Sequence, residues 1–300
     1  MLGLYGVSLA AALAAGCFSF YKLAARAGLK KATTPMLAVL AAVLGALCSR
    51  LYYHAANSLV YGMGFEGYQA LSLYPYEYAM CGTLLGVLLA ALLCALLTGQ
   101  KALQVLDVLA PAGLIALAVA RCGEHFSDFG WGQVFDSVRW QFFPAAVADM
   151  YGQWHIAVYM LEGALALLVC ACCVRVKRAM PGERFLTALL WWSVTQIFCE
   201  SLRAETIRWG FVRVQQLQCA IFILCVLIAF AVKASRRGDK KRIVPAAAAF
   251  VLGIGTVVLM EYAIDKWELS IAVCYGIMAA ALLAMGAMVQ RVRPQLLPED

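Results

Sequence analysis

Four arginines lie near the ends of apolar segments in this 300-residue chain, where their guanidinium groups could act together. They are Arg50, Arg121, Arg203 and Arg213. A guanidinium group carries a rigid fork of N–H donors that matches the oxygens of phosphate. The simpler alternative is that each side chain reaches from its segment to lipid headgroups. As a set they predict a site for an anionic ligand, because charged residues at membrane depth are rare and usually functional.

Candidate acids and bases follow Arg121 closely in the sequence. Glu124, His125 and Asp128 lie within seven residues of that arginine. Each could accept a proton, and the histidine needs the smallest change in pKa to titrate near neutral pH. These three residues are therefore the candidate general bases.

A second polar group ends a later apolar segment. Gln196, Glu200 and Arg203 recur at i, i+4 and i+7, so a helix would present them on one face. Glu162 lies inside another apolar segment, three residues after Tyr159. Glu162 could line the same site, or it could pair with an arginine of another segment and simply hold two helices together. The sequence leaves both alternatives open.

The composition shows what must position these residues. The chain is 64% hydrophobic and 14% charged, with a mean hydropathy of +0.81. A soluble domain carries about 25% charged residues, so a soluble fold is excluded. A membrane-spanning helix needs about 20 mostly apolar residues. Nine segments fit: 3–21, 35–51, 80–97, 105–120, 156–174, 185–202, 211–232, 245–262 and 269–290.

The loops predict the orientation of this all-α polytopic membrane protein. An outside N-terminus leaves seventeen of the 24 lysines and arginines inside, as the positive-inside rule requires. The net charge of +7 therefore reports topology rather than a nucleic-acid partner. The fourth segment, with Asp107 and Pro111, could be re-entrant, but the loop charges favour a crossing. The outer loop at 121–154 is rich in aromatic residues, and a loop of that length is usually functional.

Five short motifs of this sequence resemble motifs of the prolipoprotein diacylglyceryl transferases, and they follow one another along the chain in the family's order. Residues 120–132 resemble the family's Gly-Arg-x-Gly-Asn-Phe-x-Asn-Gly-Glu-x-x-Gly stretch. The other four resemblances lie at residues 48–53, 81–86, 196–203 and 216–219. The sequence departs from the family pattern at Cys81, where the family has histidine, and at Phe129, where it has glutamate. Glu124 and Ser127 replace its asparagines, and Gln196 replaces an arginine.

This resemblance implies a transferase that moves the diacylglyceryl group of phosphatidylglycerol to the lipobox cysteine in a prolipoprotein signal peptide. It implies no metal, no cofactor and no nucleic acid, and a multi-pass location in the bacterial plasma (inner) membrane among membrane lipids. Arg121 and Arg203 would hold the phosphate, with help from Arg50 or Arg213, and Glu200 would orient an arginine. The remaining residues expected to bind substrate are Tyr52, Gly82, Glu162, Gln196 and Gln216.

The resemblance also divides the chain. Residues 1–235 would form a seven-helix membrane core with an outer arm at 121–154. Residues 243–300 would add two transmembrane helices and a short cytoplasmic tail. A relative that binds or presents an anionic phospholipid without turnover, or that uses another acceptor, remains an alternative. A transporter is disfavoured, because the chain shows neither an internal repeat nor paired broken segments.

Overall fold

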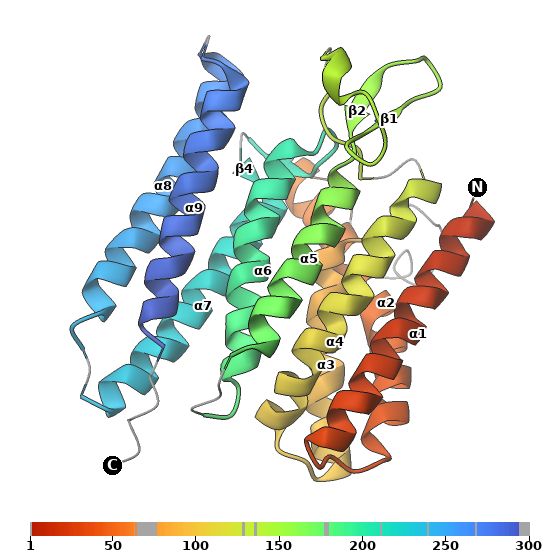
Figure 1. The fold of residues 1–300 in the computed structure, drawn as a ribbon, viewed down its shortest axis with the longest axis vertical. Coiled ribbons are helices and arrows are strands. Elements are labelled where there is room, and N and C mark those ends of the chain that lie inside the picture. Colours follow the sequence, from red (N-terminus) through yellow and green to blue (C-terminus); the bar gives the residue numbers. More distant parts are fainter. Residues whose placement is uncertain are drawn as a thin grey trace.

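The computed structural model describes residues 2–62, 64, 77–127, 130–134, 137–176, 180–210, 212–238, 240–267 and 269–293. Helices dominate these residues (Figure 1). Their bounds are α1 Leu2–Arg26, α2 Thr33–Tyr61, α3 Met80–Thr98, α4 Ala102–Gly123, α5 Val158–Val174, α6 Glu183–Leu202, α7 Val214–Arg236, α8 Ile243–Lys266 and α9 Ile271–Arg291.

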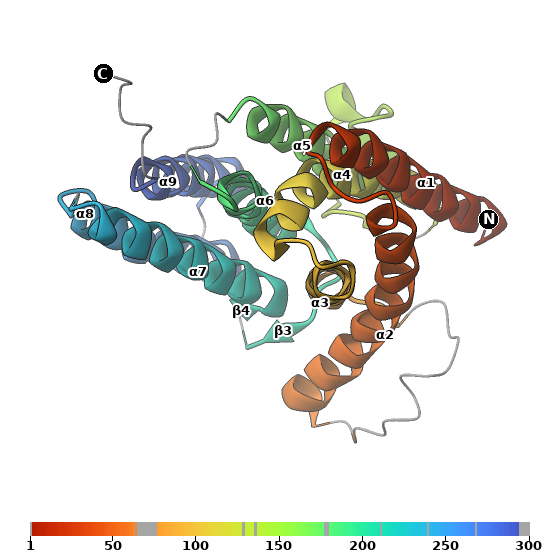
Figure 2. The same ribbon diagram turned by 90° about the horizontal axis from the view of Figure 1, so that it is seen from below.

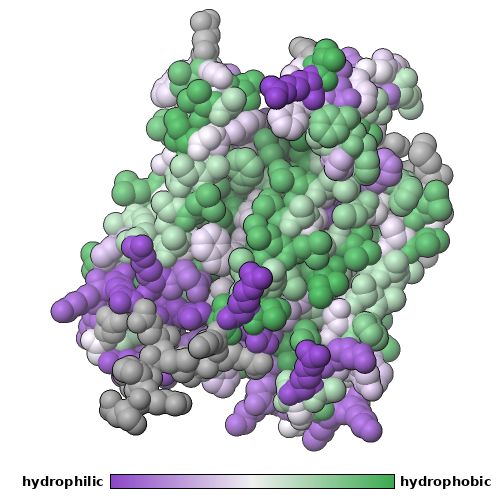
Figure 3. Space-filling model, in the orientation of Figure 1, coloured by the Kyte–Doolittle hydropathy of each residue, from purple (hydrophilic) through white to green (hydrophobic). Residues whose placement is uncertain are grey.

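The predicted class, an all-α polytopic membrane protein, is confirmed. Eight of these helices are long and apolar enough to cross a membrane, and α5 is apolar but has 17 residues. Figure 3 shows hydrophobic residues over the middle of one face and hydrophilic residues gathered at its lower end. The loops that join α1 to α2, α3 to α4 and α7 to α8 lie at that same end in Figure 1. The number of spans and the outside N-terminus stay predictions.

The fourth predicted segment forms one continuous helix, α4, in spite of Pro111. Its buried carboxylate, Asp107, accepts hydrogen bonds from the backbone N–H groups of Gly182 (2.8 Å) and Phe185 (3.0 Å). These groups belong to the first turn of α6, where N–H groups lack partners within the helix. Asp107 therefore caps a neighbouring helix, which explains an acidic residue inside an apolar segment.

The loop predicted to lie outside, at 121–154, contains β-structure that the hydropathy pattern did not predict. Strands β1 (Ala146–Ala148) and β2 (Trp154–Ile156) pair antiparallel, with Val147 opposite His155. A second hairpin, β3 (Arg208–Trp209) and β4 (Val212–Arg213), lies between α6 and α7. An isolated bridge joins Gly132 to Arg203. We call residues 130–157 the outer arm; this bridge ties the arm to the end of α6.

The last two helices share a hydrophobic core with α6 and α7. Buried residues of this core include Val257 and Met260 of α8, Leu282 and Met285 of α9, and Phe230 of α7. Figure 2 shows α8 and α9 on the opposite side of the bundle from α1 and α2. The division into a core at 1–235 and an added pair at 243–300 stays a prediction.

Candidate active site

A buried charge cluster joins the C-terminal ends of α4 and α6 to the N-terminal end of α5. Glu162 of α5 lies between Arg121, the third-last residue of α4, and Arg203, which follows α6 directly. The Nε atom of Arg121 lies 2.6 Å from Glu162 Oε2. Arg203 donates from Nε to Oε1 (3.0 Å) and from its NH2 group to Oε2 (2.9 Å) of the same carboxylate. Glu162, whose side chain is fully buried, therefore bridges the two guanidinium groups.

Two further carboxylates complete the charge cluster. Glu124 pairs with Arg121 across one helical turn and lies 3.9 Å from the NH2 group of Arg203. Glu200 makes no close pair with either arginine among the described residues, and its Oε2 lies 3.7 Å from Arg203 Nε. That oxygen has no hydrogen-bond partner among the described residues. Two guanidinium groups thus meet three carboxylates, a formal charge of −1.

One donor of Arg121 points away from the carboxylates. Its NH2 group contacts the thioether sulfur of Met80, the first residue of α3. A thioether is a weak hydrogen-bond acceptor, so a phosphate oxygen would be a much better partner for this donor. Met80 also lines a cavity, which places the charge cluster beside it.

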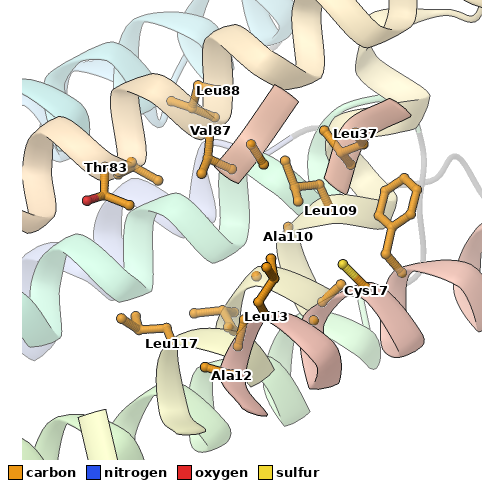
Figure 4. A pocket seen from close by; sticks show the side chains of 18 of the residues that line it. Ala12, Leu13, Cys17, Leu37, Thr83, Val87, Leu88, Leu109, Ala110 and Leu117 are labelled. Atoms are coloured by element: carbon orange, nitrogen blue, oxygen red, sulfur yellow. The ribbon is translucent and has the colours of Figure 1, made fainter. Parts of the chain in front are cut away.

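The cavity lies among α1, α2, α3, α4 and α6 and has a volume of about 380 Å³. Its lining is almost wholly apolar, as the labelled side chains of Leu13, Leu37, Leu109 and Leu117 illustrate (Figure 4). Ala120, directly before Arg121, also lines it. The cavity therefore extends from the charge cluster along the inner faces of the helices.

Three of the expected substrate-binding residues lie on α2 and α3, outside the charge cluster. Arg50 donates to Glu77 (2.7 Å), and its guanidinium lies 5.2 Å from the ring centre of Tyr78. Gly82 lets the two helices approach closely: an added Cβ would overlap the carbonyl of Cys48 and the Cβ of Tyr52. Gly82 and Tyr52 thus have a packing role here.

Cys81, the residue at the family's histidine position, is buried in α3. It directly follows Met80, whose sulfur contacts Arg121 of the charge cluster. A thiol therefore occupies a place beside the charge cluster where the family would present an imidazole.

Three more expected residues hold the end of α6. Arg213 donates from NH1 to the Arg203 carbonyl (2.9 Å) and from NH2 to the Ser201 carbonyl (3.2 Å). Gln216 donates to Ser201 Oγ (2.8 Å), and Gln196 accepts from Gln215 (3.1 Å). Arg213 therefore satisfies free carbonyls of the last helical turn and does not join the charge cluster.

The candidate bases are placed unequally. Glu124 belongs to the charge cluster, as described above. His125 is exposed, and its Nδ1 lies 3.1 Å from the hydroxyl of Tyr159. Asp128 and Phe129 lie outside the described residues.

Sequence reasoning missed two contributors. Glu261 of α8 accepts from Gln216 (2.9 Å) and lies 3.6 Å from Arg213 Nε. Its only signal is an acidic residue inside the apolar run of α8. Met80 gives no signal, because a methionine at the start of an apolar segment is ordinary.

The comparisons with known proteins decide the family. A family model for prolipoprotein diacylglyceryl transferases matches residues 1–232. The chain belongs to the prolipoprotein diacylglyceryl transferase family. A phosphatidylglycerol–prolipoprotein diacylglyceryl transferase of Staphylococcus carnosus is 26% identical over 249 residues, which cover 78% of this chain and 86% of that protein. One of Bacillus mycoides is 25% identical over 245 residues, covering 78% and 88%.

A relative with the same name from Clostridium novyi is 25% identical over 187 residues, which cover 61% of this chain and 72% of that protein. The family match ends within α7. Helices α8 and α9 therefore lie beyond the part of this transferase-family chain that the family model matches.

Proposed function

We propose that this protein transfers the diacylglyceryl group of phosphatidylglycerol to the lipobox cysteine of prolipoproteins, in a bacterial plasma membrane. The observation that carries the proposal is the contact between Arg121 and Met80, where the charge cluster meets the apolar cavity. A phospholipid has the matching chemistry, because its phosphate and its acyl chains are directly joined. The names of the relatives support the same reaction.

The cavity suits an acyl chain in length and polarity. From Leu109 to Ala120 the α4 wall rises about 16 Å, and both residues line the cavity. A chain lying along this wall would bring the glycerol backbone to the level of Arg121. The NH2 group of Arg121 would then exchange the Met80 sulfur for a phosphate oxygen. A charge-assisted hydrogen bond to phosphate is strong in such a buried setting.

The reaction breaks the bond between the glycerol carbon of the diacylglyceryl group and its phosphate oxygen. The acceptor thiolate attacks that carbon and forms a thioether. Glycerol phosphate leaves with the bonding electron pair, and Arg121 and Arg203 stabilise the charge that grows on it. The thiol proton needs an acceptor within the site.

We assign the proton to Glu200, which differs from the sequence-based candidates. Glu162 and Glu124 are held by close pairs with arginines. Glu200 Oε2 and Glu124 Oε2 are both buried and without a hydrogen-bond partner among the described residues, but only Glu200 lacks a close arginine pair, since its Oε2 lies 3.7 Å from Arg203 Nε. An unpartnered buried carboxylate oxygen gains a partner by accepting a proton. Glu162 acts as a positioning residue, because it touches both arginines.

The experiment uses the purified protein in phosphatidylglycerol vesicles with a synthetic lipobox peptide. Mass spectrometry detects the diacylglyceryl increment on the peptide cysteine. The Arg121→Ala variant removes the donor at the cavity. Arg139→Ala is the matched control, because Arg139 is an exposed arginine of the outer arm. We expect product from the unaltered chain and from the control, and none from Arg121→Ala.

Two results would contradict the proposal. Product from Arg121→Ala at the rate of the control would remove the charge cluster from the reaction. A complete lack of product, with phosphatidylglycerol still bound in an Arg121-dependent manner, would favour a lipid-binding protein or a transferase with another acceptor. In that case the first variant to test would be Cys81→His, which restores the histidine that the family has at this position.

A further inference from the structure

A second cavity opens between the outer arm and the last two helices. It has a volume of about 1050 Å³. We call it the outer chamber. The arm contributes Gln133 and Trp140, the β3–β4 hairpin contributes Arg208, and α8 and α9 contribute Asp265 and Tyr275. Helices α8 and α9 lie beyond the residues that the family model matches, so part of this chamber lies outside the matched region.

Arg203 links the outer chamber to the charge cluster. Its carbonyl oxygen accepts hydrogen bonds from Gln133 Nε2 (3.2 Å) and from the NH1 group of Arg213 (2.9 Å), and both residues line the chamber. Its guanidinium pairs with Glu162 inside the cluster. A molecule bound in the outer chamber therefore lies beside residues that contact Arg203 of the charge cluster.

The last two helices also hold the segment that carries this link. The hydroxyl of Tyr275 donates to the carbonyl of Ser201 (3.2 Å). Glu261 accepts from Gln216, which donates in turn to the hydroxyl of Ser201. Ser201 stands between Glu200 and Arg203. The chamber wall and the charge cluster are thus built on the same turn of α6.

The lining of the outer chamber argues against an anionic ligand. It holds two basic residues, Arg208 and Arg213, and two acidic ones, Glu261 and Asp265. The charges balance, and the rest of the wall is largely aromatic and aliphatic. A volume of about 1050 Å³ lies at the upper end of the usual range for a small-molecule site, about 300–1000 Å³. Mixed polar and aromatic walls of this size suit a polypeptide segment.

We propose that the outer chamber binds the polypeptide acceptor, and that α8 and α9 shape its specificity. The proposal rests on the proposed transferase function. The apolar cavity among α1–α4 and α6 would then take the lipid, and the outer chamber the segment next to the acceptor cysteine. Figures 1 and 2 show α8 and α9 on the other side of the bundle from α1 and α2. The two substrates would reach Arg203 from opposite sides.

The test fills the outer chamber without touching the charge cluster. Ala272→Trp places a large side chain at an exposed lining position at the start of α9. Val273→Trp is the matched control, because Val273 is the next residue, is exposed and does not line the chamber. Initial rates are measured against the lipobox peptide and, separately, against phosphatidylglycerol. We expect Ala272→Trp to raise KM for the peptide about tenfold and to leave KM for the lipid unchanged.

Photocrosslinking separates this proposal from the transferase function. The probe is the lipobox peptide with a benzophenone side chain two residues after the cysteine, and the crosslinked residues are mapped by mass spectrometry. Crosslinks at the arm, β3–β4, α8 or α9 support the chamber even when no diacylglyceryl product forms. Crosslinks only at α1–α4, or none at all, overturn it. An unchanged peptide KM in Ala272→Trp, or an equal rise in Val273→Trp, also overturns it.

Discussion

Gly113→Leu tests the apolar cavity, because it should raise the stability of the protein and weaken the binding of lipid. Gly113 lies in α4 and lines the cavity, and an added Cβ would meet no atom within 4 Å. An added Cβ at this position therefore forces no backbone movement, and the cavity that Gly113 lines gives room for the rest of the side chain. Replacing glycine within a helix stabilises it by about 1 kcal/mol. For a chain of this size we expect the melting temperature to rise by roughly 2–4 °C.

The same side chain should weaken the binding of phosphatidylglycerol. It displaces about four methylene groups of an acyl chain, each worth about 0.8 kcal/mol when buried. The loss, about 3 kcal/mol, corresponds to a rise of roughly a hundredfold in KM for phosphatidylglycerol. The peptide KM should stay the same. Initial rates in mixed micelles and a thermal melt of the same preparation provide both numbers.

The matched control is Gly6→Leu. Gly6 lies in α1, is exposed, and also has no atom within 4 Å of an added Cβ, but it does not line the cavity. It should gain stability and keep its lipid KM. The reasoning is refuted if Gly113→Leu melts higher yet binds lipid normally, because the cavity would then not hold the acyl chain. A lower melting temperature would instead mean that the cavity is not open space.

Three further predictions concern the groups that position the site. Glu162→Gln should lower kcat/KM about a hundredfold, because both arginines lose their shared carboxylate and shift. Initial rates are compared with those of the control Glu205→Gln, since Glu205 is exposed. Equal rates in the two variants would contradict this prediction. Asp107→Ala should lower the free energy of unfolding by about 1 kcal/mol, because the cap of α6 is lost. The melting temperature should fall, while the transfer rate at low temperature stays the same. An unchanged melting temperature would contradict the capping role. Burial raises the pKa of Asp149, but N–H donors from Gln153 and Tyr151 and the nearby His155 outweigh it and lower that pKa. Its stabilisation of the arm is therefore complete above about pH 4 and lost as the pH falls through the lowered pKa; proteolysis of the arm should accelerate there, and not in Asp149→Asn.

The helices and the class of protein followed from the sequence because one strong signal determines them. Long apolar runs have few alternatives in a membrane, since every backbone group must be paired within the segment. The short β-hairpins of the outer arm had no comparable signal. Strands of two or three residues, such as β1 and β3, are too short to show an alternating pattern.

Part of the charge cluster was predictable for a local reason. Glu200 and Arg203 are only three residues apart, so they lie near each other although α6 ends at Leu202 and Arg203 is extended, and Arg121 with Glu124 repeats that spacing. The bridge through Glu162 depends on how α5 packs against α4 and α6, which no local pattern encodes. Arg213 shows the same limit. Its position near the end of an apolar segment suggested an anion site, but in the structure it donates hydrogen bonds to the carbonyls of Ser201 and Arg203.

The third carboxylate of the charge cluster has a chemical rationale in the proposed reaction. Two carboxylates would neutralise Arg121 and Arg203, and Glu162 and Glu124 make the close pairs. When the carbon–oxygen bond breaks, the departing phosphate gains one negative charge and the acceptor thiol loses one proton. If Glu200 takes that proton, the carboxylates lose one negative charge as the phosphate gains one. The net charge of the buried site then stays constant through the step, which matters because an uncompensated charge in a buried site is costly.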